Sequence, residues 1–249
     1  MSNKIMFRST TIVLVFIFLT SYTVIAQTEN KEHLSGFLMT SITYKFNPKW
    51  TAYTELQARS IEKFTPLDYY ETKGGIGYSI NSRNQPFIGF GRYTTFREHD
   101  LYQRELRLWL QYTFTNNIGK LKLDHRGRAE QRFFHYPQTA DNKTDQRFRY
   151  RLSATLPINK KKVEAQTFFV NGFEELFFGP RADLLKRNRL FTGLGYQFTN
   201  TVGVSTGYMW QRELAPGGNR NLHFIYLALN FLLNKKSDEG HHIDVPVAD

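Results

Sequence analysis

Arginine recurs in one alternating phase along two neighbouring segments of the chain, and this pattern has the most evident chemistry. The two sets are Arg126, Arg128 and Arg132, followed by Arg147, Arg149 and Arg151. A guanidinium is always charged, and its planar fork can pair bidentately with a carboxylate or a phosphate. If the two segments are antiparallel strands joined by a loop, their arginines lie side by side on one face of a sheet.

Carboxylates share the alternating phase of these arginines. We therefore expect one polar network on the inner face of a barrel, formed by Glu55, Arg59, Glu71, Glu105, Arg107, Arg126, Arg128, Glu130, Arg132, Arg147, Arg149, Arg151 and Arg189. Two interpretations stay open. In the first, ion pairs fill a narrow interior and the network is structural. In the second, the excess of arginine lines a conduit for small anionic solutes, such as phosphates or acidic sugars.

A surface hydrolase that modifies lipids at the rim of the barrel is the alternative from a different class. Such an enzyme needs a nucleophile that is oriented by a base, and the candidates are His99 or His135 with the hydroxyl of Ser60 or Thr94. No spacing marks these residues as a unit, so we predict no catalytic site. The chain contains no cysteine, zinc-ligand spacing or phosphate-binding loop, and we expect neither a metal nor a cofactor.

The elements that position these residues are strands, because the hydrophobic period after residue 35 is two. In one such segment, Leu106, Leu108 and Leu110 alternate with Glu105, Arg107 and Trp109. The alternating runs extend over about ten residues or more, which is the length that a tilted strand needs to cross a membrane. Strands of globular proteins are typically about 5–6 residues long. The pattern therefore predicts an all-β fold, an antiparallel transmembrane β-barrel.

Eleven alternating segments can be counted along the chain. They are 36–47, 50–60, 69–80, 86–97, 101–114, 120–135, 146–157, 163–178, 188–199, 202–212 and 221–233. Bacterial single-chain barrels have an even number of strands, so we predict twelve strands, with ten as the alternative. The outward face of segment 163–178 switches near Gly172, and a β-bulge at this glycine would explain the switch.

Connections and aromatic residues follow the arrangement of transmembrane barrels, which have short turns at one end and longer loops at the other. The longer loops are expected at 61–68, 136–146, 179–187 and 213–220. Aromatic side chains favour the two membrane–water interfaces. We expect one girdle beside the short turns, from Tyr44, Phe46, Trp50, Tyr112, Phe114, Tyr196 and Phe198. We expect a second beside the loops, from Tyr69, Tyr93, Tyr102, Phe134, Phe178, Tyr208 and Trp210.

The first 26 residues have the three-part layout of a secretory signal peptide. Lys4 and Arg8 precede an apolar run, and small residues at 24–26 offer a cleavage site after Ala26. We predict a signal peptide at 1–26, a polar segment at 27–35, the barrel at 36–233 and a polar tail at 234–249.

Export limits the possible partners. The formal net charge of +11 is basic enough for nucleic acid, but an exported protein rarely meets nucleic acid, so we predict none. We expect the outer membrane of a Gram-negative bacterium, with its lipids as partners, and no pattern addresses the oligomeric state. A soluble periplasmic β-sandwich could bury the same apolar faces in its core and stays open as an alternative.

Several stretches resemble the domain-of-unknown-function family 2490, whose members are predicted to be outer-membrane barrels. They are Gly127 to Phe133, Phe148 to Pro157, Glu174 to Phe178 and Asn188 to Phe198, with Leu56 to Arg59 and Gly-Tyr pairs at 77–78, 195–196 and 207–208. Their order and spacing extend over nearly the whole chain after the signal peptide. The resemblance implies the barrel architecture and no catalytic residues.

Overall fold

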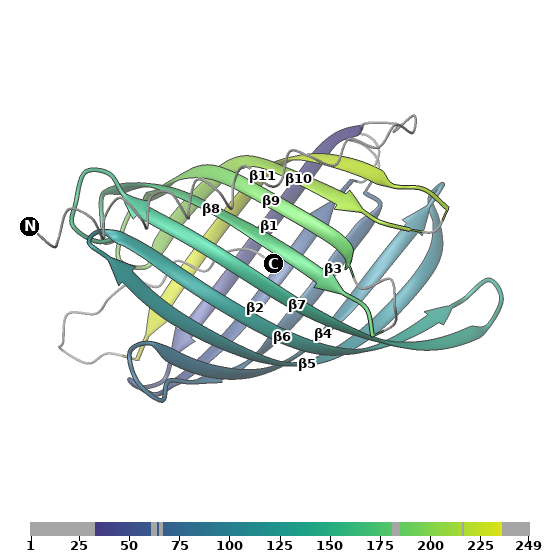
Figure 1. Ribbon diagram of the computed structural model, residues 1–249, viewed down its shortest axis with the longest axis horizontal. Coiled ribbons are helices and arrows are strands. Elements are labelled where there is room, and N and C mark those ends of the chain that lie inside the picture. Colours follow the sequence, from purple (N-terminus) through teal and green to yellow (C-terminus); the bar gives the residue numbers. More distant parts are fainter. Residues whose placement is uncertain (1–32, 61–63, 65–66, 181–184, 216, 236–249) are drawn as a thin grey trace, which may run out of the picture. The chain divides into compact units, whose positions relative to one another are not determined.

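The computed structural model describes residues 33–60, 64, 67–180, 185–215 and 217–235, which form a closed barrel of eleven strands (Figure 1). The strands are β1 (His33–Lys45), β2 (Trp50–Arg59), β3 (Tyr69–Tyr78), β4 (Asn84–Arg97), β5 (Asp100–Ile118), β6 (Leu121–Tyr136), β7 (Asp141–Pro157), β8 (Thr167–Phe178), β9 (Leu185–Gln197), β10 (Val202–Glu213) and β11 (Arg220–Asn234). The signal peptide predicted at 1–26 lies outside the described residues. In the described part of the chain, no helix is long and apolar enough to cross a membrane.

The barrel closes through a parallel pair of strands. Each strand is antiparallel to the next along the chain, but β1 pairs with β11 in parallel, from His33 opposite Leu222 to Lys45 opposite Asn234. The prediction of twelve or ten strands was therefore wrong, although the eleven alternating segments correspond to the eleven strands. An even number of strands is required only if the first and last strands also pair in antiparallel orientation. A parallel closure allows an odd number and places the two ends of the described barrel at opposite rims.

The two faces of the barrel wall differ in polarity, with charge on the inside and apolar residues on the outside. On β5, the outward side chains of Leu106, Leu108 and Leu110 are 49%, 48% and 65% exposed. Glu105 and Arg107, which alternate with them, are buried. A closed single sheet with a buried polar face is not a β-sandwich, whose sheets pack apolar faces together, so the sandwich alternative is wrong.

Strand β8 keeps one alternation throughout its length, so the bulge predicted at Gly172 was wrong. Gly172 pairs regularly with Ala154 on β7 and with Thr192 on β9. The register shift of this strand lies between Phe177 and Phe178. The apparent switch of face arose because the inner face of β8 itself carries large apolar rings, at Phe169, Phe173 and Phe177.

The aromatic residues near the loops divide between the two faces, which corrects the second predicted girdle. Tyr69, Tyr93 and Phe134 are buried inside the barrel, whereas Tyr208 is 42% exposed on the outer face. The predicted loop at 136–146 is also mostly strand, since Tyr136 of β6 already pairs with Asp141 of β7. The difference in length between turns and loops is therefore smaller than the sequence indicated.

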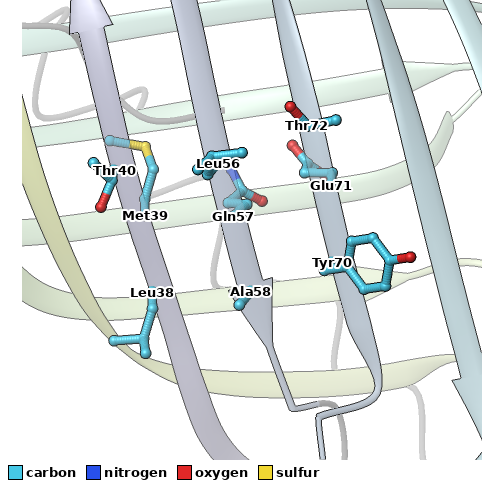
Figure 2. Close-up of a pocket in the computed structure, with 9 residues that line it drawn as sticks. All are labelled: Leu38, Met39, Thr40, Leu56, Gln57, Ala58, Tyr70, Glu71 and Thr72. Atoms are coloured by element: carbon cyan, nitrogen blue, oxygen red, sulfur yellow. The ribbon is translucent and has the colours of Figure 1, made fainter.

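A shallow groove of about 490 Å³ lies on the wall formed by β1, β2 and β3 (Figure 2). Its outward-facing lining consists of Leu38, Thr40, Leu56, Ala58, Tyr70 and Thr72. In the register of the three strands, the small Ala58 lies between Leu38 and Tyr70. This alternation of small and large side chains produces the hollow.

Glycines make room for the aromatic rings inside the barrel. A Cβ atom added to Gly195 would lie 2.1 Å from the Phe169 ring, and one added to Gly89 would lie 2.3 Å from the Trp109 ring. Both distances are far shorter than a van der Waals contact. The rings therefore occupy the space that a side chain on the neighbouring strand would otherwise take.

We expect Gly195→Ala to destabilise the barrel by about 1–3 kcal/mol, because the added methyl group overpacks the Phe169 site. Gly127→Ala is the matched control, since an added Cβ meets nothing within 4 Å there, and we expect it to leave stability unchanged or slightly higher. Urea-induced unfolding of the two purified variants, followed by circular dichroism, measures the difference. Equal midpoints for both would contradict the packing described.

Candidate functional site in the barrel interior

Two buried carboxylates, Glu130 and Glu175, lie at the centre of the arginine network. Glu130 accepts hydrogen bonds from Arg147 Nε at 2.7 Å and Arg149 Nη1 at 2.9 Å. Glu175 accepts from Arg126 Nη2 at 2.7 Å, from Arg149 Nε at 2.9 Å and from Arg151 Nη2 at 2.9 Å. Arg149 therefore joins the two carboxylates through different nitrogens of one guanidinium.

The register of β6, β7 and β8 places these groups together. Arg126 pairs with Arg151 and Arg128 pairs with Arg149 across β6 and β7, which would repel if no anion intervened. Glu130 pairs with Arg147 in the same ladder, and Glu175 of β8 pairs with Arg151. Glu130 thus lies on the same strand as Arg128, two residues further along. The row formed by Arg126 and Arg151 continues to Glu175 on β8.

Three more arginines approach the same two carboxylates at longer distances. Arg128 Nη1 is 3.6 Å and Arg107 Nε is 3.9 Å from Glu130, while Arg189 Nη1 is 3.7 Å from Glu175. Seven guanidiniums therefore surround two carboxylates. Ion pairs within this cluster leave a large local excess of positive charge in a space that is largely closed to water.

Aromatic rings lie under several of these guanidiniums. The Phe177 ring lies beneath Arg147 at 5.0 Å and Arg149 at 4.6 Å, and the Phe173 ring beneath Arg151 at 4.2 Å. The negative face of an aromatic ring attracts a cation. The rings thus stabilise the positive cluster without adding a formal charge, and they exclude water from it.

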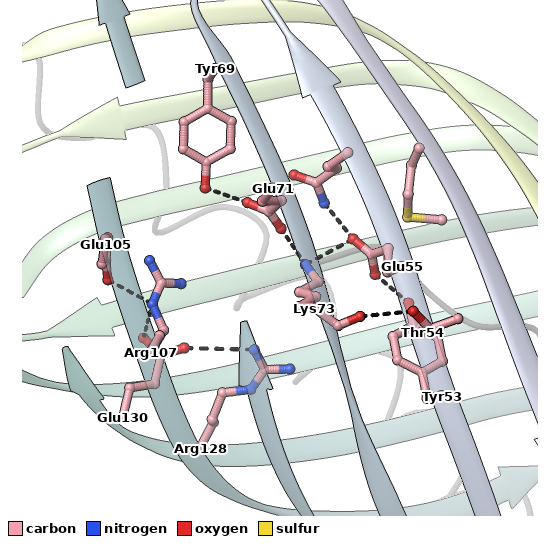
Figure 3. Close-up of polar contacts among 12 residues, drawn as sticks. Tyr53, Thr54, Glu55, Tyr69, Glu71, Lys73, Glu105, Arg107, Arg128 and Glu130 are labelled. Atoms are coloured by element: carbon pink, nitrogen blue, oxygen red, sulfur yellow. Dashed lines mark hydrogen bonds and ion pairs between the residues drawn. The ribbon is translucent and has the colours of Figure 1, made fainter. Parts of the chain in front are cut away.

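A third carboxylate extends the network toward the loop end of β5 and β6. Glu105 accepts hydrogen bonds from Arg107 Nε at 2.9 Å and Arg132 Nε at 2.7 Å. Arg132 also lies 3.2 Å from Asp145 of β7. Arg107 links this part to the centre, because it lies between Glu105 and Glu130 (Figure 3).

Positive and negative charges are balanced on the inner face of β2 and β3, where Glu55 and Glu71 accompany Lys73 and Arg59. Lys73 Nζ lies 2.8 Å from Glu55 and 2.5 Å from Glu71, between the two carboxylates (Figure 3). Tyr53 donates to Glu55 and Tyr69 donates to Glu71. The interior therefore has a charge-balanced region on β2 and β3 that is distinct from the arginine cluster of β5 to β9.

A third region of the interior, on β1 and β8 to β11, is apolar. Its buried side chains are Phe37, Met39, Phe173, Phe191, Met209, Leu222, Phe224, Tyr226 and Ala228. The sequence analysis did not identify this region as interior. The signal was present in β11, where Leu222, Phe224 and Tyr226 alternate with the outward Ile225 and Leu227.

All thirteen residues of the expected network face the interior, where ten are buried and Arg59, Arg126 and Arg132 are half-buried. Arg59 lies over the Tyr69 ring at 3.9 Å, and no carboxylate of the described residues forms an ion pair with it. Arg189 donates two hydrogen bonds to Gln211, at 3.0 and 2.8 Å. The expected set omitted Glu175, which accepts hydrogen bonds from three arginines, because the supposed bulge at Gly172 obscured its face.

The candidate catalytic residues at the rim do not form a unit in the part of the chain that the structure describes. His135 Nδ1 lies 3.1 Å from Asn142 Oδ1, and Ser60 Oγ accepts a hydrogen bond from the Gly36 amide. His99 lies in the two-residue turn between β4 and β5. The same residues contain no group of three or more histidine, aspartate or glutamate side chains that could hold a metal ion.

A family described as protein of unknown function (DUF2490) matches residues 34–222. The chain belongs to this family. The matched residues run from β1 to the start of β11 and include every arginine and glutamate of the network, so the resemblance noted in the sequence is confirmed. No curated protein and no solved structure matched the chain. Membership in the DUF2490 family therefore assigns no activity.

We expect Glu175→Gln to destabilise this DUF2490 barrel by about 3–5 kcal/mol, because it leaves buried arginines without their counter-charge. Glu174→Gln is the matched control, since Glu174 is on the opposite face and accepts a hydrogen bond from Asn188 at 3.2 Å. That variant should stay within about 0.5 kcal/mol of the parent. Urea titrations of both variants test the difference, and a Glu175→Gln barrel as stable as Glu174→Gln would contradict the assigned role.

Proposed function

We propose that this DUF2490 protein is a non-enzymatic outer-membrane barrel of a Gram-negative bacterium that binds small anions in its interior and conducts them slowly. In this proposal the chain is exported and its signal peptide is removed after Ala26. The observation that carries the function is the cluster of seven guanidiniums around Glu130 and Glu175.

Insertion in a membrane is supported by the polarity of the wall. Apolar side chains are exposed all around the barrel, for example Leu38, Phe90, Leu110, Phe168 and Leu194. An apolar surface of this extent is unfavourable in water, whereas an outward apolar band is what a membrane barrel presents to lipid. The charged side chains of the network face the interior of the barrel, away from the surface that would contact lipid.

Anion preference is supported by the excess of arginine over carboxylate. A ring of arginine or lysine favours anions in a pore, and a guanidinium can bind a carboxylate or phosphate through two hydrogen bonds. An incoming anion would compensate positive charge that Glu130 and Glu175 leave unmatched. A cation would meet repulsion in the same space.

Slow conduction follows from the width of the barrel. Barrels of about eight strands are just filled by side chains, and those with about 16–18 strands enclose an aqueous channel. An eleven-stranded barrel is closer to the first case, and here Phe177, Phe173 and the arginines extend into the interior. Only small solutes could pass such side chains.

Membrane fractionation with a gel-mobility comparison tests the location. We expect the chain in the outer-membrane fraction, and we expect unboiled protein to migrate differently from boiled protein because a closed barrel resists detergent. Recovery from the soluble periplasm without a mobility shift would contradict the proposal.

Planar bilayer recordings test the conduction. We expect small steps whose reversal potential in a KCl gradient indicates chloride preference, and a reduced preference in Arg128→Gln, which removes one guanidinium that hydrogen-bonds Gln111 at 2.7 Å. Arg83→Gln, in the turn before β4, is the control and should behave as the parent. Large non-selective steps, cation preference or a silent membrane would each contradict the proposal.

A further inference from the structure

Two arginines lie on the outer face of the wall, which otherwise exposes many apolar side chains. Arg92 of β4 and Arg104 of β5 both have outward, exposed side chains. Arg92 is opposite Leu106 and Arg104 is opposite Thr94, so the two arginines are diagonal neighbours across the β4–β5 pair. Among the residues that the structure describes, the side chain of neither arginine has a hydrogen bond or an ion pair.

A basic neighbour lies on the other side of Arg104. His135 of β6 pairs with Arg104 in the register and faces outward. His135 contacts Asn142 of β7, which carries no charge. The outer face of β4 to β7 at this level thus presents two permanent positive charges and an imidazole, with no carboxylate in contact with them in the described chain.

The groove on β1 to β3 adjoins this positive patch. Thr72, which lines the groove, is directly opposite Arg92 in the β3–β4 register, and Tyr70 is opposite Thr94. Figure 2 shows Leu38, Ala58 and Tyr70 along the groove on consecutive strands. An apolar hollow therefore ends beside an unpaired guanidinium.

The two features together fit one amphiphilic molecule. An arginine on the lipid face of a barrel costs about 2–4 kcal/mol at the midplane of the bilayer and about 0–1 kcal/mol near the interface. A phosphate group lowers this cost, because it pairs with a guanidinium through charge-assisted hydrogen bonds. Arg92 lies next to the exposed Phe90 and Leu106, so the phosphate would come from a molecule that is itself anchored in the apolar layer.

We propose that Arg92, Arg104 and the groove form a binding site for one anionic phospholipid of the surrounding membrane. The phosphate lies between the two guanidiniums, and one acyl chain occupies the groove over Ala58. A lipid with an additional ammonium group binds less well, because that cation approaches Arg92, Arg104 and His135. The inference rests on the proposed membrane location, since the groove must face lipid.

The test uses the folded full-length chain in detergent, with folding verified by the mobility shift of unboiled protein. Phosphatidylglycerol or phosphatidylcholine is titrated in, and bound lipid is counted by native mass spectrometry. We expect one phosphatidylglycerol to bind at least roughly tenfold more tightly than phosphatidylcholine, because both lipids offer the phosphate but only phosphatidylcholine brings an ammonium group close to the two guanidiniums.

Variants separate the two halves of the site. Arg92→Gln combined with Arg104→Gln should reduce phosphatidylglycerol binding to the level of phosphatidylcholine. Ala58→Phe, which fills the groove, should weaken the binding of both lipids. Arg83→Gln, an arginine on the turn at the opposite rim, is the control and should bind as the parent does.

Several outcomes would overturn the site. Equal binding of the two lipids by the parent chain would remove the role of the arginines, as would an equal loss in Arg83→Gln. A dimer that disappears in Ala58→Phe would identify a second copy as the occupant of the groove. A chain without a mobility shift would refute the proposed membrane barrel as well, whereas a shifted chain without lipid preference would refute the lipid site alone.

Discussion

Seven arginines can share the inside of this narrow barrel only because Glu130 and Glu175 lie between them. Like charges that face each other across a strand pair destabilise a sheet, and the pairs Arg126–Arg151 and Arg128–Arg149 are of this kind. Arg149 contacts both carboxylates and so connects β6, β7 and β8. The same contacts oppose a slip of register, because a shift by one residue would turn every arginine of a strand to the outer face.

The interior is not uniform, and its three regions set what it can do. Carboxylates and cations balance on β2 and β3, guanidiniums predominate on β5 to β9, and rings and methionines fill the space on β8 to β11 and β1. Gly195 makes room for the Phe169 ring on β8, and Gly89 makes room for the Trp109 ring on β5. A solute would therefore meet a positive surface along one side of the wall and an apolar, dry surface along the other.

Local alternation was sufficient to predict the class of fold, the eleven segments and the inward position of residues such as Arg128 and Glu130. It failed where both faces of a strand carry large apolar side chains. On β8 the inward Phe169 and Phe173 resembled outward residues, and Glu175 was omitted from the network for that reason. Tyr69 and Tyr93 were assigned to the outside by the same ambiguity. The number of strands depends on the pairing of β1 with β11, which no local pattern encodes.

The parallel pair of β1 and β11 has a consequence for how the chain folds. Every other pair of neighbouring strands is joined by a connection of two to nine residues, so those pairs form from local contacts. The pairing of His33 with Leu222 brings together residues from the two ends of the described barrel, and contacts of such long range form slowly. Until they form, the thirteen residues of β1 present an open edge, and an open edge is a site of mispairing between chains. The half-made barrel is thus most vulnerable to aggregation along β1 until β11 has paired with it.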